Sequence, residues 1–378
     1  MRKLLHVVNI SFVLPYYIGE QFAHFEKLGY RFYVACTHSE HLLNYAEEKK
    51  FIPFPIPILR SINPFQDIKS ILALRRFIKE NKIDIVFGHT PKGALIGMAA
   101  GYLSGVKSRI YFRHGLMYET TSGFKRFMLK TIERITSNMA TDIVCVSQSV
   151  IEKSNKEKLN KPEKNILLNK GTCNGIDSIR FSLASVSALK KQELFQKYNI
   201  DVNSKVIGYV GRLVNDKGIN ELIEAWKILL KEVKNIKLLL IGPFEDRDAL
   251  SMEVKDYIIN EPSIIFAGLI EDVQPFYSLM DIFILPSYRE GFPTVILEAS
   301  SMEVPVITTR STGCVDSIIE NFTGKYTDID PIDIAKNIQS YLSDEHMAKQ
   351  HGLNGRQFVL DNFNQQIIWK EIENKFLN

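Results

Sequence analysis

The sequence predicts an α/β protein built from two doubly wound parallel sheets. Its 378 residues are too many for one ordinary hydrophobic core and are enough for two domains. Short apolar runs alternate with helical stretches in both halves of the chain, a pattern typical of α/β domains. Several runs, such as 206–210 and 282–285, are apolar on both faces, and such strands belong to parallel sheets that helices cover on both sides.

The predicted elements follow one another in regular order. The strands expected in the first half are 4–10, 31–36, 84–88, 109–112 and 142–146. The strands expected in the second half are 205–210, 237–241, 263–267, 281–285 and 304–308. Amphipathic stretches between them, such as 68–79 and 220–230, predict the helices.

Weak patterning around residues 178–200 predicts a domain boundary. We therefore expect an N-terminal domain over 1–180 and a C-terminal domain over 181–360. The remaining segment, 361–378, ends in a helical pattern of apolar residues. This last helix could pack back on the N-terminal domain.

Composition excludes several classes of protein. Hydrophobic residues make up 45% and charged residues 24% of the chain, as in soluble globular proteins. No stretch holds the roughly 20 apolar residues of a membrane-spanning helix, and the first apolar run is too short for a signal peptide. The 4 cysteines form no Cys-x-x-Cys pair, so they predict neither a zinc site nor a disulfide framework. The simplest location is a reducing cytoplasm.

Charge is divided unevenly between the two halves. Residues 1–180 contain 27 Lys and Arg against 15 Asp and Glu, a net charge of +12. Residues 181–378 contain 20 and 28, a net charge of −8. The basic half could face an anionic membrane or an anionic acceptor, or the asymmetry could be drift in surface charge.

One basic stretch of the first half, residues 124–134, is also rich in large apolar residues. It interleaves Lys125, Arg126 and Lys130 with phenylalanine, methionine and leucine. Such a stretch could dock on anionic lipid headgroups, or it could be an amphipathic helix that packs on its own sheet.

The first cluster with chemical potential is the loop 210–218, Val-Gly-Arg-Leu-Val-Asn-Asp-Lys-Gly. It follows a buried strand and precedes an amphipathic helix. Gly211 permits a sharp turn at the strand end. Arg212 and Lys217 then lie near a helix N-terminus, where two cations and backbone N–H groups can bind a diphosphate. The alternative is a solvated loop with ordinary surface charges.

The second cluster is the segment 286–299, which follows the predicted strand 281–285. Glu290 lies in the loop and Glu298 in the second turn of the next helix. Gly291 and Phe292 would offer backbone N–H groups at the start of that helix. A carboxylate in the loop can hold sugar hydroxyls, and one in the helix can hold a ribose. Alternatively, Glu290 is a charge favoured at a helix N-terminus and Glu298 is a surface residue, although apolar residues surround it in the sequence.

The two clusters together resemble the retaining glycosyltransferases with the GT-B fold, the glycosyl transferases of group 1. The shared features are the Gly-Arg-Leu…Lys-Gly loop and a Glu-Gly-Phe-Pro…Glu pattern with seven residues between the two glutamates. The resemblance covers nearly the whole chain and extends to residues 174–177, 241–243, 266–268 and 305–308. It implies two Rossmann-like domains that face each other across a cleft, with an acceptor site in the N-terminal domain and a nucleotide-sugar site in the C-terminal domain.

A narrower resemblance lies in the first half. Three short motifs are similar to a subgroup that builds bacterial capsule, O-antigen and glycoprotein glycans. They are Arg-Ser-Ile-Asn-Pro at 60–64, His-Thr-Pro-Lys-Gly at 89–93 and His-Gly-Leu at 114–116. The resemblance implies transfer of a hexose or N-acetylhexosamine from a UDP-linked donor. It also implies a polyprenyl-diphosphate-linked acceptor and a peripheral location at the inner face of the cell membrane.

The resemblance also implies roles for individual residues. The donor site would comprise Gly211, Arg212, Lys217, Gly268, Glu290, Gly291, Phe292 and Glu298. Within it the two cations would hold the diphosphate, Glu290 the sugar hydroxyls and Glu298 the ribose, with the glycines and Phe292 giving backbone contacts.

In the first half, the resemblance implies that His114 lies near the reacting sugar and belongs, with Arg212, Lys217 and Glu290, to the catalytic set. A lone histidine after a strand is otherwise a structural residue. Gly19, His89 and Lys92 would lie on the acceptor side. One departure from the family is that the loop 11–20 lacks the usual Gly-Gly pair, which implies a bulkier, more apolar acceptor side.

Other interpretations remain. The Asp-x-Asp patterns at 246–248 and 328–330 are interpreted as solvated loop acids, so neither a metal nor a cofactor is expected. The rivals are a sugar-nucleotide epimerase of the same architecture and a non-catalytic sugar-nucleotide-binding subunit. A dinucleotide dehydrogenase is disfavoured because no Gly-x-Gly-x-x-Gly follows the first strand, and no nucleic-acid partner is expected.

Overall fold

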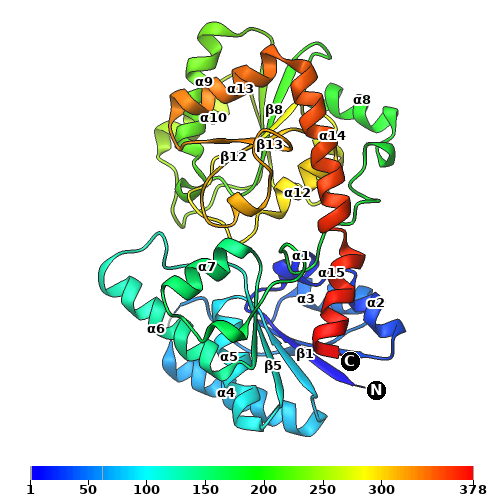
Figure 1. Cartoon of the computed structure of the whole chain (residues 1–378), viewed down its shortest axis with the longest axis vertical. Helices are drawn as coiled ribbons and strands as arrows, with labels where there is room; N and C mark the ends of the chain where they lie inside the picture. Colours follow the sequence, from blue (N-terminus) through cyan, green and yellow to red (C-terminus); the bar gives the residue numbers. More distant parts are fainter. Residues whose placement is uncertain (1, 62, 378) are drawn as a thin grey trace. The chain divides into compact units, whose positions relative to one another are not determined.

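The computed structural model describes residues 2–61 and 63–377, which form two compact units (Figure 1). Unit 1 contains the residues up to Gly175 together with those from Gln366 onward, and unit 2 is Ile176–Gln365. Ile62, in the middle of the Arg-Ser-Ile-Asn-Pro motif, lies outside the described residues.

Unit 1 is organised around a seven-stranded parallel sheet with the order β3-β2-β1-β4-β5-β6-β7. Its strands are β1 (Lys3–Val7), β2 (Arg31–Cys36), β3 (Ile52–Pro55), β4 (Ile85–Gly88), β5 (Ser108–Arg113), β6 (Asp142–Cys145) and β7 (Asn165–Ile166). The strand order changes direction between β1 and β4, and ligands of open α/β sheets bind at such switch points, beyond the carboxyl ends of the strands.

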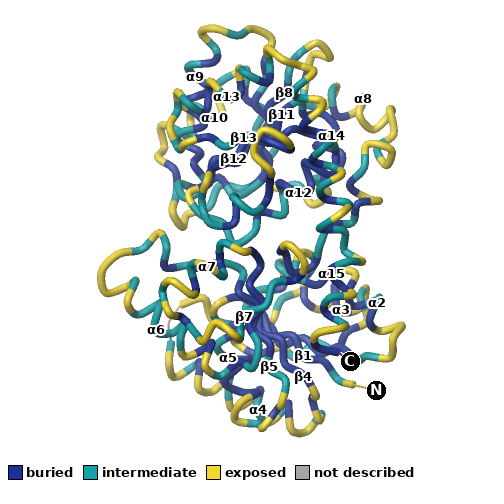
Figure 2. The backbone as a smooth tube through the Cα atoms, in the orientation of Figure 1, coloured by how far each residue is buried: buried dark blue, intermediate teal, exposed yellow. Residues whose placement is uncertain are grey.

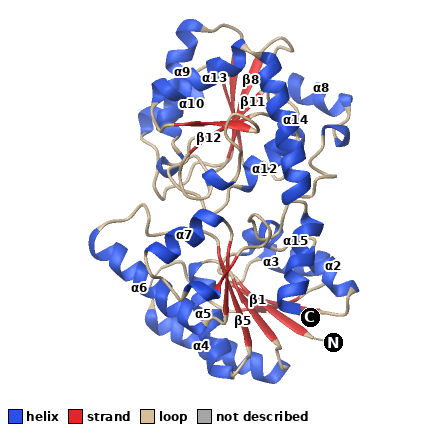
Figure 3. Ribbon diagram, viewed as in Figure 1, coloured by secondary structure: helices blue, strands red, loops and turns tan. Residues whose placement is uncertain are grey.

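Helices cover both sides of this sheet (Figure 3). Those of unit 1 are α1 (Leu14–Tyr17), α2 (Gln21–Lys27), α3 (Glu40–Lys49), α4 (Pro64–Asn81), α5 (Pro91–Ser104), α6 (Gly123–Met139), α7 (Gln148–Lys156) and α15 (Gln365–Ile372). Short helical turns are η1 (Ser11–Val13), η2 (Pro162–Lys164) and η6 (Glu373–Leu377). The inner strands β1, β2, β4, β5 and β6 are mostly buried between these layers (Figure 2), which explains why their sequences are largely apolar on both faces.

Unit 2 contains a six-stranded parallel sheet with the order β10-β9-β8-β11-β12-β13. Its strands are β8 (Lys205–Val210), β9 (Ile236–Ile241), β10 (Ile264–Gly268), β11 (Ile282–Leu285), β12 (Val306–Thr309) and β13 (Gly324–Thr327). In chain order within the unit this is 3-2-1-4-5-6, the order of dinucleotide-binding domains, with the switch point between β8 and β11.

The helices of unit 2 pack on its sheet around an extensive buried core. They are α8 (Ala188–Lys197), α9 (Ile219–Glu232), α10 (Met252–Asn260), α11 (Gln274–Tyr277), α12 (Thr294–Ser301), α13 (Pro331–Ser343) and α14 (Glu345–Asn362). The short turns are η3 (Leu183–Ser185), η4 (Asn215–Lys217) and η5 (Cys314–Asp316).

The C-terminal segment belongs to unit 1 and is anchored there by polar contacts. The indole N–H of Trp369 donates to Asn174 Oδ1 at 2.9 Å. The Tyr30 hydroxyl donates to the carbonyl oxygen of Leu377, also at 2.9 Å. These contacts hold α15 and η6 against the sheet that the N-terminal half of the chain forms.

The predicted α/β fold with two doubly wound parallel sheets is confirmed. Each predicted strand corresponds to a strand of the structure, with ends that differ by a few residues. Three strands that were not predicted, β3, β7 and β13, are all edge strands. No helix within residues 2–61 and 63–377 combines the length and the apolar character needed to cross a membrane.

Candidate active site

The candidate donor site lies at the switch point of unit 2, where the loops after β8 and β11 meet. Gly218, at the end of the first loop, has a φ of +71°. A Cβ atom there would lie 2.1 Å from the carbonyl oxygen of Pro286, so only glycine permits this approach. The backbone N–H of Tyr288 also donates to the carbonyl oxygen of Asp216 at 3.0 Å. These contacts therefore hold the two loops together beyond the carboxyl ends of β8 and β11.

This packing brings together two side chains that are 73 residues apart in sequence. Lys217 Nζ lies 2.5 Å from Glu290 Oε1, and the two side chains are only 14% and 15% exposed. The backbone N–H of Glu290 donates to the carbonyl oxygen of Thr312 at 3.0 Å, which fixes the loop from its other side. The result is a mostly buried ion pair at the carboxyl end of the sheet.

Arg212, the second predicted cation, is more open to solvent. Its side chain is 42% exposed, and its Nη1 donates to Glu245 Oε2 at 2.7 Å. Burial alone would lower the pKa of Arg212, but the Glu245 carboxylate raises it. The Tyr209 hydroxyl donates to the backbone carbonyl of Arg212 at 2.8 Å and so holds the turn that Gly211 makes.

Glu298 lies in α12, as predicted, but it is buried and not on the surface. Its residue exposure is 7%, and the Tyr277 hydroxyl donates to its Oε2 at 2.7 Å. Burial raises the pKa of this carboxyl, while the Tyr277 hydrogen bond opposes that rise. The interpretation of Glu298 as an ordinary surface residue is therefore wrong.

The remaining predicted donor-site residues lie along the same edge. Gly268 ends β10, and its carbonyl oxygen accepts from the backbone N–H of Gly242 at 2.8 Å. Gly291 and Phe292 come just before α12, and the Phe292 ring lies 5.3 Å from the Phe363 ring. Gly291 is the next residue after Glu290, so its backbone lies beside the ion pair. Gly268 is farther from the pair, because β10 is two strands away from β8 in the sheet order.

In unit 1, His89 and His114 follow the neighbouring strands β4 and β5 and contact each other. His89 Nδ1 lies 3.0 Å from His114 Nε2, and the Tyr17 ring stacks on His114 with centroids 3.7 Å apart. A third histidine, His6 in β1, lies 3.0 Å from His89, measured from its Nδ1 to His89 Nε2. Burial lowers the pKa of all three histidines, that of His89 to about 3, so that they are neutral at neutral pH.

The other two residues predicted on the acceptor side have different surroundings. Gly19 lies in the turn between α1 and α2 with a φ of +51°. Lys92, in the first turn of α5, pairs with Asp67 of α4, and both side chains are mostly buried. The positive charge of Lys92 is therefore already balanced by the Asp67 carboxylate.

Comparison with known proteins identifies the family. The family described as glycosyl transferases group 1 matches residues 190–358, and the one described as glycosyl transferase 4-like matches residues 4–147. The capsular polysaccharide biosynthesis glycosyltransferase CapM of Staphylococcus aureus is 35% identical over 377 residues, covering 99% of this chain and 97% of CapM. The chain belongs to the glycosyl transferases group 1 family. Its activity is that of a glycosyltransferase.

Two further similarities support this assignment. The UDP-Gal:alpha-D-GlcNAc-diphosphoundecaprenol alpha-1,3-galactosyltransferase of Escherichia coli is 26% identical over 333 residues. The match covers 87% of this chain and 84% of the Escherichia coli enzyme. The structure of a glycosyltransferase from Rickettsia africae has a TM-score of 0.82 at 20% identity, covering 99% of this chain and 97% of the other. The latter similarity establishes the GT-B fold that the motifs implied.

One aspartate of each acidic motif that could suggest a metal in this glycosyltransferase has a structural role. Asp248 Oδ2 accepts from the backbone N–H of Asp216 at 2.6 Å. Asp330 caps α13 by accepting from the backbone N–H groups of Ile332 and Asp333, each at 3.0 Å. Within the described part of the chain, no group of three or more His, Cys, Asp or Glu residues is placed to hold a metal ion.

Sequence reasoning missed several residues of both sites. Glu245, the partner of Arg212, directly precedes the Asp-x-Asp motif at 246–248, and nothing in its sequence spacing indicates that it pairs with Arg212. Cys314 is buried beside the Lys217–Glu290 pair; burial, with the Glu290 charge, raises the pKa of its thiol to about 11, so it is no nucleophile at neutral pH. His6 had one available signal, a titratable residue in the middle of an apolar strand.

Proposed function

We propose that this glycosyltransferase moves a hexose or N-acetylhexosamine from a UDP-linked donor to a polyprenyl-diphosphate-linked saccharide in the biosynthesis of a capsule or another surface polysaccharide. The names of the two similar enzymes support the substrate classes, since one makes capsule and the other uses a UDP-sugar and a diphosphoundecaprenol-linked acceptor. The observation that carries the proposal is the Lys217–Glu290 pair at the switch point of unit 2, with Arg212 on the same loop as the lysine.

In this proposal the donor binds to unit 2. Arg212 and Lys217 hold the diphosphate, since charge-assisted hydrogen bonds to phosphate oxygens are strong and directional. Glu290 holds hydroxyls of the sugar. Glu298, oriented by Tyr277, accepts hydrogen bonds from the ribose. The backbone N–H groups of Gly291 and Phe292, at the start of α12, would add donors for an anion.

The proposed reaction retains the anomeric configuration, as the resemblance to the retaining glycosyltransferases implies. The bond between the anomeric carbon and the diphosphate oxygen breaks, and the cations stabilise the charge that develops on the leaving group. The acceptor hydroxyl attacks from the same face, so its proton can pass to the departing diphosphate. The two cations and the helix N-terminus replace a metal ion in this role.

In the proposal the acceptor binds to unit 1, with Gly19, His89 and Lys92 on the acceptor side and His114 near the reacting sugar. Two aromatic rings of the short helical segments after β1, Phe12 of η1 and Tyr16 of α1, are 49% and 46% exposed and contact each other. Exposed aromatic residues in place of a Gly-Gly pair favour an acceptor with an apolar portion.

Peripheral attachment to an anionic membrane completes the proposal. Phe124 and Phe127 of α6 are 79% and 64% exposed, beside the exposed Lys125. By contrast, Arg126 and Lys130 pair with Glu157 and are directed toward the protein. The phenylalanines and Lys125 are therefore the groups with which α6 would contact lipid headgroups.

A panel of nucleotide sugars tests the proposal directly. The full-length protein is screened by calorimetry for binding of UDP, GDP and their sugars, and then for transfer to short polyprenyl-diphosphate-linked saccharides. UDP-sugar binding and transfer that depends on the acceptor are expected. Conversion of the donor to an epimer without any acceptor, or binding without turnover across the panel, would favour one of the two rival functions.

A further inference from the structure

The three histidines of unit 1 form one continuous row of hydrogen bonds, here called the histidine row (His6, His89 and His114). The two N···N distances are both 3.0 Å, from His6 Nδ1 to His89 Nε2 and from His89 Nδ1 to His114 Nε2. The rings come from β1 and from the loops directly after β4 and β5, which are adjacent in the sheet. His89 uses both ring nitrogens in the row, so the row ends at His6 Nε2 and at His114 Nδ1.

The surroundings keep these rings neutral. Phe87 stacks on His6 and Phe112 stacks on His89, with ring centroids 4.7 Å apart in both cases. Burial lowers the pKa of each histidine, and a charge on His89 would lower that of its two neighbours further. A neutral imidazole carries one N–H and one lone pair, so each link needs a donor on one side and an acceptor on the other.

This requirement leaves only two arrangements of protons. Either all three rings carry their proton on Nε2, or all three carry it on Nδ1. Any mixed arrangement places two N–H groups or two lone pairs against each other, and an unsatisfied buried polar group costs about 1–3 kcal/mol. His114 Nδ1 accepts a hydrogen bond in the first arrangement and donates one in the second.

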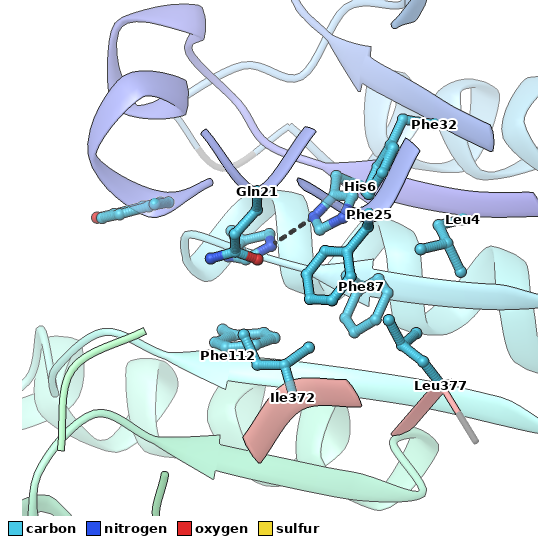
Figure 4. Close-up of a pocket in the computed structure, with 11 residues that line it drawn as sticks. Leu4, His6, Gln21, Phe25, Phe32, Phe87, Phe112, Ile372 and Leu377 are labelled. Carbon is cyan, nitrogen blue, oxygen red and sulfur yellow. Dashed lines mark hydrogen bonds between the residues drawn. The ribbon is translucent and has the colours of Figure 1, made fainter. Parts of the chain in front are cut away.

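The inner end of the row can accommodate either arrangement. His6 lines a cavity of about 10 Å³ together with Gln21, and Ile372 and Leu377 of the C-terminal segment close it (Figure 4). That volume is about the smallest that admits one water molecule. Because water can both donate and accept, it could satisfy His6 Nε2 in either proton arrangement.

We propose that His6 and His89 are positioning residues that set, through the histidine row, whether the outer nitrogen of His114 donates or accepts a hydrogen bond toward a ligand of unit 1. A ligand carbonyl or phosphate oxygen selects the arrangement with protons on Nδ1, and a ligand hydroxyl that donates selects the other. That the ligand is a sugar or its acceptor rests on the proposed function; the coupling of the three tautomers does not.

Nitrogen NMR of the histidine side chains tests the coupling without any substrate. The full-length protein is labelled with ¹⁵N only in its 8 histidines, and long-range ¹H–¹⁵N spectra report which ring nitrogen is protonated. We expect His6, His89 and His114 to show the same tautomer, or the same tautomer populations, at neutral pH. Different tautomers on the three rings, or a doubly protonated ring, would overturn the proposal.

A substitution at the inner end tests transmission along the row. His6→Phe fits the aromatic surroundings of His6 and removes its link to His89. The tautomer populations of His89 and His114 should then change together. The control is His41→Phe, on α3, because His41 is exposed and stacks on the Tyr45 ring, with centroids 5.9 Å apart, outside the histidine row. A change at His89 without one at His114, or no change at either, would contradict the proposal even though the wild-type spectrum had agreed with it.

Transfer kinetics connect the row to function. If only one tautomer of His114 supports transfer, kcat/KM of His6→Phe falls by the same factor as the population of that tautomer, about twofold for an even mixture. His41→Phe should keep the wild-type value. A loss of activity with unchanged tautomers would reduce His6 to a structural role. A wild-type protein that transfers no sugar would refute the proposed function and leave the NMR result standing.

Discussion

Replacing Lys217 with alanine should have two separable effects, one on the stability of unit 2 and one on UDP affinity. The ammonium lies 2.5 Å from Glu290 Oε1, and both side chains are about six-sevenths buried. A hydrogen bond to a charged group contributes about 1.5–3 kcal/mol, and breaking a fully buried pair costs about 3–5 kcal/mol. Since this pair retains some solvent contact, we expect unit 2 to lose about 2 kcal/mol of stability and to stay folded.

The second effect is the loss of a contact to the donor diphosphate. A charge-assisted contact of the same kind, about 1.5–3 kcal/mol, corresponds to a dissociation constant for UDP that rises about 10- to 150-fold. Glu290→Gln removes only a carboxylate that holds the sugar in the proposal. Its UDP affinity should therefore not fall, and it should rise where the lost carboxylate no longer competes with the diphosphate for Lys217. By contrast, kcat should fall because the sugar loses a contact in the transition state.

The double variant Lys217→Ala/Glu290→Gln separates the pair from the ligand contact. It should recover part of the stability that Lys217→Ala loses, because the neutral amide needs no cation, but it should bind UDP as weakly as Lys217→Ala. Lys227→Ala is a matched control, since Lys227 pairs with Glu224 at 2.7 Å on the exposed face of α9, where such pairs contribute little. The measurements are denaturant unfolding and calorimetric titration with UDP. Wild-type UDP affinity in a folded Lys217→Ala protein, or equal losses for both single variants, would refute the assignment of the diphosphate to Lys217.

Four further predictions follow from the two sites and the surface. Transfer should persist in excess chelator, and a loss that magnesium or manganese restores would show that a metal holds the leaving group. Glu298→Gln should weaken UDP binding about tenfold without changing pyrophosphate binding, and calorimetry with both ligands separates the ribose from the diphosphate. Acid should destabilise unit 1 between pH 6.5 and about 3, because His89 is protonated in the unfolded chain but not in the folded protein, where burial lowers its pKa to about 3. The free energy of unfolding should fall by about 2 kcal/mol at pH 5. Trp369 fluorescence in a Trp226→Phe protein should report this unfolding, and a stability that stays constant from pH 7 to 5 would contradict the prediction. Phe124→Ser/Phe127→Ser should abolish flotation with anionic vesicles at low salt and leave UDP binding unchanged, and equal flotation of variant and wild type would exclude α6 as the contact.

The fold could be predicted because the central strands of both sheets are buried on both faces, which makes their sequences continuously apolar. The three missed strands lack that signal because each lies at a sheet edge. β3 contains Pro53 and Pro55, which an edge strand tolerates because one side of it needs no ladder hydrogen bonds. β7 has only 2 residues, and β13 reads Gly-Lys-Tyr-Thr. Such strands are defined by their neighbour in the sheet and not by their own composition.

The donor-site residues were predictable because carboxyl ends of parallel strands meet at one edge, so motifs after β8 and β11 had to lie close together. Their pairing state was not predictable. Whether Lys217 reaches Glu290, and Arg212 reaches Glu245, depends on side-chain directions that spacing does not encode. His6 was missed for a related reason: only the register of β1 against β4 places it beside His89.

The two switch points differ in electrostatic character, since one gathers neutral side chains and the other gathers ion pairs. This difference bears on how the donor could be recognised. In unit 1 the groups that meet at the carboxyl ends of β1, β4 and β5 are neutral histidines, with the Lys92–Asp67 pair between the helices α5 and α4. In unit 2 each predicted cation is already paired with a carboxylate. A diphosphate that takes Lys217 leaves Glu290 without its partner in a mostly buried position, which is unfavourable unless new donors reach that carboxylate. Sugar hydroxyls are such donors. The pair would therefore make binding of the diphosphate and binding of the sugar depend on each other, so that a complete nucleotide sugar satisfies both charges while a nucleotide alone satisfies only one.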